Sequence, residues 1–285
     1  MNGEKAIQES FEYERTSDGI RLTNYIGADP VVNIPSEIEG VPVRILGSHA
    51  FFERGLEVER ILVPDSIRVI EPYACEFCLS LQELRLGNDV EVLGRAFLAV
   101  SQQEVLYVPA SVKEIEAPDE LGLLLYIDPE NPVYYSQDDV LYKRLPGGGI
   151  SLEATQCCAE HFPEPSEGAA DLPAADELTE EPEESDRRDL RSEFCVPEGV
   201  TRIAEHALDK EERLRAIELP SSLRELAEGV LTGMNNPFAE GGISDIKVAA
   251  DNPVFFIEDD ALLCRLSDGG LKLVRYLRKA GTVFE

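Results

Sequence analysis

Residues 64–84 read PDSIRVIEPYACEFCLSLQEL, and residues 197–217 repeat the same order of side chains as PEGVTRIAEHALDKEERLRAI. Each segment opens with a proline and has an apolar residue three positions later. A further apolar residue follows, with alanine four positions beyond it, as in Ile70 and Ala74. Self-similarity of this kind is the sequence signature of a repeat protein. The two segments therefore predict a chain built from stacked copies of one small unit.

A short apolar triplet that ends in proline or glycine begins each copy. The triplets are VNIP to Pro35, ILVP to Pro64, LRLG to Gly87, LYVP to Pro109, FCVP to Pro197 and IELP to Pro220. Proline cannot donate a ladder hydrogen bond, so it ends a strand and begins a turn. One such unit buries too little apolar surface to fold alone, so its strands must pair with those of its neighbours. We predict a solenoid with a parallel strand ladder.

A longer duplication contains the hairpin signals of the chain. Residues 126–152 resemble residues 248–273 at an offset of 121, which aligns Asn131 with Asn252. In both copies aromatic residues precede an Asp-Asp pair, an apolar segment and a glycine-rich turn. This order predicts a strand, a turn, a strand, a second turn and a third strand. We expect each hairpin-like unit to close one array, which makes two arrays in tandem.

These residues carry a family resemblance. Residues 11–51 resemble the first unit of BspA-like leucine-rich repeat proteins, as do the repeat at 63–84 and the hairpin NPVYYSQDDVLYKR at 131–144. The resemblance covers about residues 11–158 and 194–285. It implies a β-rich α/β fold, a curved leucine-rich repeat solenoid with a parallel strand ladder on its concave face. It also implies binding rather than catalysis, and many relatives look like secreted or surface proteins.

The predicted organisation has four parts. They are a capping segment at 1–30, a first array with its hairpin unit at 31–158, an acidic insertion at 159–193, and a second array with its hairpin unit at 194–285. Residues 160–193 hold 13 acidic and 3 basic residues. Such a segment buries too little apolar surface to fold, so we expect disorder there. A solvated linker is favoured over an acidic arm that captures a basic partner.

The net charge of −30, from 56 acidic and 26 basic residues, argues against nucleic-acid partners. The chain has no apolar run of the roughly 20 residues that a spanning helix needs, so membrane insertion is not expected. Its first residues lack the basic and apolar regions of a secretory signal. This predicts a cytoplasmic location, with a secreted or surface location as the alternative if a signal was removed. The oligomeric state stays open.

Several motifs could carry chemistry, but each has a structural explanation. They are Cys75-x-x-Cys78, His49 and His206 at one repeat position, the pairs Asp138–Asp139 and Asp259–Asp260, Gly147–Gly149, and the basic cluster Lys272, Arg275, Arg278 and Lys279. A zinc site would need a second ligand pair at chelating distance, and the adjacent Cys157–Cys158 pair is poorly spaced. We favour core packing for the cysteines, a shared surface or edge role for the histidines, turns for the Asp-Asp pairs and the glycine run, and a solvated edge for the basic cluster. We expect no enzyme activity, catalytic residue, cofactor or metal.

The function that we predict is non-catalytic protein–protein binding on a leucine-rich repeat scaffold. The partner would be a protein or peptide, and the acidity favours a basic one. The strand residues expected to face outward are Asn33, Leu62, Arg85, Tyr107 and Glu218, although a register error of one residue would invert this set. The alternative is a secreted or cell-surface adhesin that binds host matrix or glycans. A spacer without a specific ligand is the third hypothesis.

Overall fold

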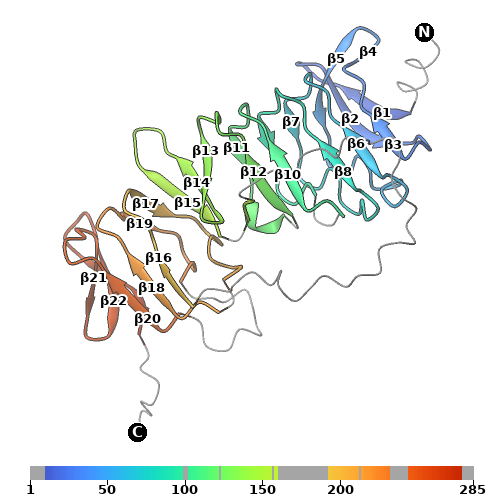
Figure 1. Ribbon diagram of the computed structural model, residues 1–285. Coiled ribbons are helices and arrows are strands. Elements are labelled where there is room, and N and C mark those ends of the chain that lie inside the picture. Colours follow the sequence, from blue (N-terminus) through green and yellow to red (C-terminus); the bar gives the residue numbers. More distant parts are fainter. Residues whose placement is uncertain are drawn as a thin grey trace, which may run out of the picture. The chain divides into compact units, whose positions relative to one another are not determined.

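The computed structural model describes residues 10–98, 102–121, 123–155, 157–159, 192–211, 213–231 and 243–277. The chain divides into two compact units, residues 1–160 and 161–285. Nearly all regular elements are short β-strands; the described residues contain one 3-10 helix, η1 (Pro118–Glu120), and no α-helix (Figure 1). The β-rich leucine-rich repeat fold is therefore confirmed, and its helical part is reduced to η1.

Two ladders run through the first unit, because each coil supplies a strand to both. The first ladder begins with an antiparallel hairpin of β1 (Phe11–Arg15) and β2 (Ile20–Tyr25). Four strands then follow β2 in parallel order: β5 (Val41–Leu46), β7 (Val69–Ile70), β9 (Val92–Leu93) and β11 (Glu114–Ile115). The short strand β4 (Glu37–Ile38) pairs with β5. The second ladder contains β3 (Val31–Asn33), β6 (Arg60–Leu62) and β8 (Glu83–Arg85), all parallel. The strands β10 (Val105–Val108) and β12 (Leu124–Ile127) form a parallel pair of their own.

A side chain continues the second ladder where the backbone pairing stops. The Leu84 N–H donates to Gln103 Oε1 at 2.6 Å, and Gln103 Nε2 donates to the Val105 carbonyl at 2.8 Å. The amide of Gln103 thus supplies a donor and an acceptor between β8 and β10, as a strand residue would. This explains how the array passes from the regular coils to the irregular one that follows them.

The core of each coil comes from alternate strand residues. The middle residue of each three-residue strand is buried, as in Val32, Ile61 and Leu84. The alanines that the repeat predicted, Ala50 and Ala74, are also buried, because the turn after each strand packs against the next coil. Only small side chains fit at such closely packed positions.

A hairpin unit follows the first array, and a buried asparagine holds it. Its strands are β13 (Tyr134–Gln137), β14 (Val140–Arg144) and β15 (Ile150–Ala154), all antiparallel. Asn131 Nδ2 donates to the carbonyls of Pro109 and Val112, and Asn131 Oδ1 accepts from the Val133 and Tyr134 N–H groups. One side chain therefore satisfies four backbone groups and connects the array to the hairpin.

The second unit repeats this plan with fewer coils. Its ladders are β16 (Glu193–Cys195), β18 (Ala216–Leu219) and β20 (Asp245–Val248), and β17 (Val200–Ile203) with β19 (Glu225–Leu226). The hairpin strands are β21 (Phe255–Glu258), β22 (Ala261–Arg265) and β23 (Leu271–Tyr276). Asn252 makes the same four hydrogen bonds, to Pro220, Leu223, Val254 and Phe255. The aligned asparagines thus have equivalent structural roles.

Candidate binding surfaces

The five predicted strand residues lie on the outward side of their ladders. Asn33, Leu62 and Arg85 are in register across β3, β6 and β8, and they are exposed or half-buried, while the residues before them are buried. Tyr107 is half-buried, and Glu218 is exposed beside Lys247 of β20. The structure thus brings the first three together, whereas Glu218 belongs to the second unit. Their role in binding stays a prediction.

Tyr107 forms the aromatic part of this strand face. Its ring stacks on Tyr126 of β12 with centroids 6.1 Å apart, and its hydroxyl donates to the Asp128 carboxylate. Partial burial, and then the hydrogen bond to Asp128, raise the pKa of Tyr107 to about 12. Both effects disfavour the charged phenolate, so the hydroxyl stays a neutral donor at physiological pH.

A second surface lies on the turns between the two ladders of the first unit. We call it the turn-face patch and define it as His49, Phe52, Leu56, Tyr73, Phe77 and Leu79. Phe52, Leu56 and Phe77 are 57%, 64% and 48% exposed. The rings form a chain of contacts, in which Tyr73 stacks on His49 at 5.7 Å, His49 meets Phe52 at 6.1 Å, and Phe52 meets Phe77 edge-on at 5.6 Å. Contiguous exposed apolar groups of this kind mark interaction surfaces.

The turn backbone sets the direction of these side chains. His49, Tyr73 and Phe77 have φ of 58°, 63° and 65°, a left-handed conformation that costs energy for bulky residues. Gly55 allows the turns to approach closely, because a Cβ there would lie 3.0 Å from the Phe77 carbonyl oxygen. His206 has the same conformation at the corresponding position of the second unit, with φ of 63°, so it belongs to the turn of the repeat. The chain thus tolerates strain at three positions of a single exposed patch.

The charged groups around the turn-face patch are mostly acidic. His49 Nε2 lies 3.1 Å from the Glu76 carboxylate, and Arg54 pairs with Glu57 at 3.2 Å. Glu53 is exposed in the same turn. An apolar centre with a charged rim is the usual composition of a protein interface.

The sequence pattern did not predict this patch, because the predicted binding surface comprised only strand residues. A signal was present: Phe52 and Phe77 are apolar residues in corresponding turns that fall outside the buried repeat pattern. Their spacing of 25 residues is close to the repeat length. Turn exposure, however, depends on the backbone conformation, which the apolar pattern does not reveal.

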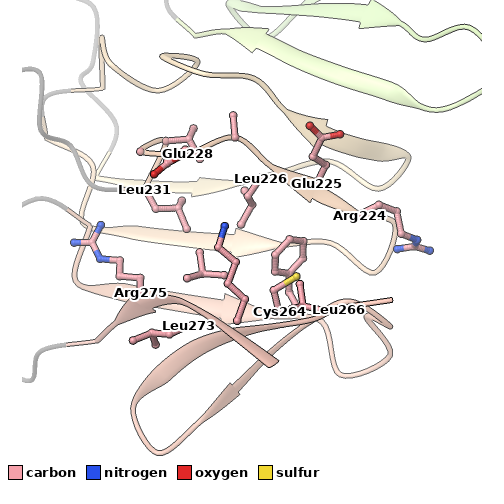
Figure 2. Close-up of a pocket in the computed structure, with 15 residues that line it drawn as sticks. Arg224, Glu225, Leu226, Glu228, Leu231, Cys264, Leu266, Leu273 and Arg275 are labelled. Atoms are coloured by element: carbon pink, nitrogen blue, oxygen red, sulfur yellow. The ribbon is translucent and has the colours of Figure 1, made fainter. Parts of the chain in front are cut away.

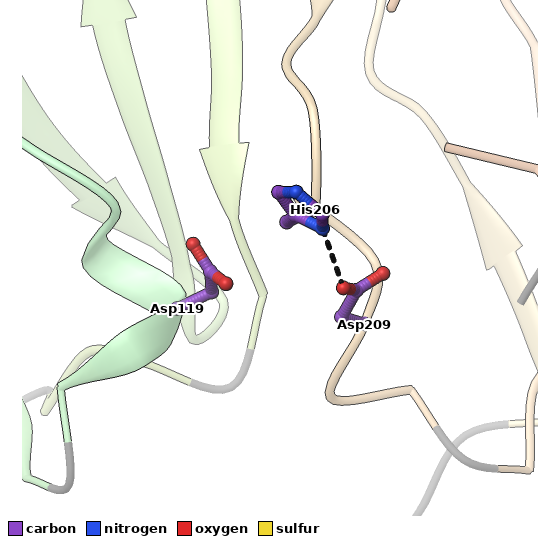
Figure 3. A group of neighbouring side chains, drawn as sticks. All are labelled: Asp119, His206 and Asp209. Atoms are coloured by element: carbon purple, nitrogen blue, oxygen red, sulfur yellow. Dashed lines mark hydrogen bonds and ion pairs between the residues drawn. The ribbon is translucent and has the colours of Figure 1, made fainter. Parts of the chain in front are cut away.

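Packing and turn positions account for Cys75, Cys78, His49 and His206. Cys75 and Cys78 are fully buried in the core. The hydrogen bond with Cys78, and then desolvation, raise the pKa of Cys75, which opposes formation of a thiolate. His206 is half-buried, with Nδ1 2.8 Å from Asp209 Oδ2 (Figure 3). His49 and His206 share one left-handed turn position in different units.

The acidic pairs and the glycine run form turns. Asp138 and Asp139 have φ of 51° and 63°, and Asp259 and Asp260 have 49° and 57°. Two consecutive positive φ values between paired strands define a type I′ hairpin turn, in which aspartate is well tolerated. Gly147–Gly149 also have positive φ values. The predicted insertion lies outside the described residues except for 159, 192 and 193, as do Arg278 and Lys279.

The sequence carries leucine-rich repeats of the BspA type. The family profile "BspA type Leucine rich repeat region" matches residues 32–118 and 189–240, in six copies. The resemblance seen in the sequence is thereby confirmed. A search of curated proteins found no match.

Solved bacterial leucine-rich repeat structures are similar to the chain. A leucine-rich cell surface protein from Faecalibacterium prausnitzii is 16% identical, covering 84% of this chain and 74% of that one, with a TM-score of 0.36. The pneumococcal vaccine antigen PcpA is 13% identical over 84% and 71% of the two chains, with a TM-score of 0.44. The T. pallidum leucine-rich repeat protein is 26% identical over 42% and 68%, with a TM-score of 0.34. In the described part of this chain no helix is long and apolar enough to cross a bilayer.

Proposed function

We propose that the chain is a non-catalytic protein-binding scaffold and that the turn-face patch of the first unit is its main recognition surface. The observation that carries this proposal is the exposure of Phe52 and Phe77 in edge-on contact. Aromatic side chains are enriched at the energetic centres of interfaces. A folded chain gains nothing from leaving such rings in water, whereas a partner can bury them.

The partner's chemistry follows from the patch and its rim. Aliphatic or aromatic side chains would cover Phe52, Leu56 and Phe77, while basic groups would face Glu53 and Glu57. Charge complementarity of this kind speeds association and selects partners more than it adds affinity. A basic protein surface with an apolar centre is thus the expected partner. The outward strand residues Asn33, Leu62 and Arg85 form a second, more polar surface on the same unit.

Site-specific crosslinking tests this assignment. A photo-reactive amino acid replaces Leu56 in one variant of the full chain and Asn33 in another, so that each surface carries one probe. We expect a partner to be crosslinked from position 56 and not from position 33. The opposite pattern would move recognition to the strand face. Crosslinking between copies of the chain itself, with a dimer in solution, would contradict the proposal of a different protein as partner.

The purified partner then allows a quantitative comparison. Replacing both Phe52 and Phe77 with serine removes the exposed rings and leaves the buried core unchanged. We expect the affinity to fall by about a hundredfold, since interface aromatics contribute about 2 kcal/mol or more each and are not additive. The matched control is Arg85→Ala with Asn33→Ala, which should change the affinity by less than about threefold. Equal losses in both variants would contradict the assignment.

A further inference from the structure

The second unit contains a hollow of about 370 Å³ between β19, the turn that follows it and the terminal hairpin (Figure 2). Its apolar lining comes from both sides, with Leu226 and Leu231 from the array and Phe255, Leu266 and Leu273 from the hairpin. Such a volume lies at the lower end of the range of small-molecule sites, about 300–1,000 Å³. The hollow belongs to the second unit alone, so it is independent of the turn-face patch.

The corresponding space of the first unit is lined by a different set of contacts. There the Tyr134 hydroxyl accepts the Ile115 N–H at 3.0 Å, and the Lys143 ammonium lies over the Tyr134 ring. The strand β15 contacts η1, and its residues Leu152 and Ala154 are fully buried. The Tyr134 ring, the Lys143 ammonium and η1 thus lie where the array of the first unit meets its hairpin.

Three facing residues differ in the second unit at the same offset of 121. Phe255 replaces Tyr134 and has no hydroxyl, Cys264 replaces Lys143 and is much shorter, and Arg275 replaces Ala154. Phe255 and Cys264 are cross-strand partners, as Tyr134 and Lys143 are. Two of these differences remove filling atoms. The third adds a guanidinium at the wall of the space that they leave.

Arg275 is half-buried and lines the hollow. One of its nitrogens, Nη1, is buried and has no hydrogen-bond partner among the described residues. Desolvation lowers the pKa of Arg275. Lys272, from the same strand, also lines the hollow. At the rim, Arg224 donates to the Ser221 and Leu223 carbonyls, and Glu225 pairs with Arg202 at 3.2 Å, so their charges are engaged elsewhere.

We propose that the hollow of the second unit binds a small carboxylate with an apolar body, such as a medium-chain aliphatic acid. The hydrocarbon would lie against Phe255, Leu226 and Leu231, and the carboxylate would accept hydrogen bonds from Arg275. A guanidinium presents paired N–H donors that match a carboxylate. Glu228 also lines the hollow and is exposed to solvent.

Two cysteines of the second unit provide a site-resolved test in the full chain. Cys264 lines the hollow and is half-buried, whereas Cys195 is exposed in β16 and does not line it. The rate of alkylation of each by iodoacetamide is measured by peptide mass mapping, with octanoate as the probe. We expect saturating octanoate to slow alkylation of Cys264 by about fivefold or more, because access is blocked. The rate at Cys195 should not change.

Control ligands and variants separate anion recognition from apolar filling. Octylamine and octanol, which have the same chain, should protect Cys264 at least tenfold more weakly than octanoate, since a charged hydrogen bond contributes about a factor of ten. Arg275→Ala introduces the residue that the first unit has at this position and should weaken octanoate protection about tenfold. Arg275→Lys, which keeps the charge, should retain part of it. Each variant is compared with and without octanoate, so a changed intrinsic thiol reactivity cancels.

Two results would overturn the proposal. One is an unchanged Cys264 rate at saturating octanoate, which would mean that the hollow takes no such ligand. The other is equal protection by octanoate and octanol that survives Arg275→Ala, which would make the hollow apolar but not an anion site. Circular dichroism of the Arg275 variants confirms that they are folded before either result is interpreted.

Discussion

The hairpin units that close the two arrays have the same scaffold and different contents. Asn131 and Asn252 each bind four backbone groups, and both hairpins turn on an Asp-Asp pair. The side chains beneath them differ, and in the second unit they line a hollow. A buried asparagine and an Asp-Asp turn therefore support the hairpin in both units. The side chains that face the array are then free to diverge.

The largest effect on stability should come from replacing the buried asparagine that the two hairpins share. Asn131→Ala leaves four backbone groups of the first unit without their partner, and Asn252→Ala does the same in the second. We expect each to lower the free energy of unfolding of its unit by about 4 kcal/mol or more, since each unsatisfied buried group costs about 1–3 kcal/mol. Hydrogen exchange measured by mass spectrometry resolves the two units. Loss of protection in the unmutated unit alone would refute the assignment.

The next largest effect on stability should come from exchanging the residues at the aligned positions 154 and 275. Ala154→Arg places a guanidinium in a fully buried position of the first unit and should cost about 3 kcal/mol, because the charge has no partner and the space is filled. The reverse change, Arg275→Ala, should alter stability by less than about 1 kcal/mol. Urea unfolding of the full chain measures both. Similar costs for the two substitutions would show that the hairpins are filled alike.

The Tyr134 hydroxyl is a further difference between the two hairpins, and it can be tested alone. Tyr134→Phe gives the first hairpin the ring of the second and deprives the Ile115 N–H of its acceptor. We expect a loss of about 1–2 kcal/mol by urea unfolding. Phe255→Tyr is the matched control. It should stabilise the second unit only if its hydroxyl reaches the N–H of Leu226, and it should weaken octanoate binding by filling the hollow.

The smallest effect concerns the strand faces, where Tyr107 and Tyr126 of the first unit correspond to Glu218 and Lys247 of the second. The folded pKa of Tyr107, about 12, lies above its ordinary value of 10. Its contribution to stability is therefore complete below pH 10 and is lost as the pH rises from 10 to 12, since the unfolded chain ionises first.

Ultraviolet titration of tyrosinate checks this prediction. Burial also raises the pKa values of Tyr25, Tyr134 and Tyr135, so several tyrosines should titrate late, and Tyr107→Phe should reduce the amplitude of this component by one tyrosine. Tyr126→Phe is the control that leaves the Asp128 hydrogen bond in place. A late component of unchanged amplitude in the Tyr107→Phe variant would contradict the raised pKa of Tyr107.

Much of the architecture was predictable from local sequence. The proline-ended triplets predicted the strands β3, β6, β10, β16 and β18, and the Asp-Asp pairs predicted the hairpin turns, because both depend on backbone preferences of a few adjacent residues. The aligned asparagines were recognised as equivalent, but their four hydrogen bonds were not foreseen. Two of those bonds in each unit join the hairpin to carbonyls 19 to 32 residues earlier in the chain.

The candidate sites were much less predictable. The sequence alone allowed Asn33, Leu62 and Arg85 to face either outward or inward, because a shift of one residue inverts the faces of a strand. Only the structure decides between the two directions. The turn-face patch depends on left-handed φ values at His49, Tyr73 and Phe77, residue types that rarely adopt them. No apolar pattern indicates such a conformation.

The repeat period, the two arrays and the hairpin units follow from the order of residues, because short-range backbone preferences and alternating burial act within one coil. The exposed aromatic patch and the hollow lined by Arg275 follow from how separate coils and hairpins pack. Phe52 meets Phe77 because two turns stack closely at Gly55. The hollow exists because Phe255 and Cys264, in different strands, both lack atoms that their counterparts have. Such relations depend on the distances between elements far apart in the chain, and these are set only when the elements pack together.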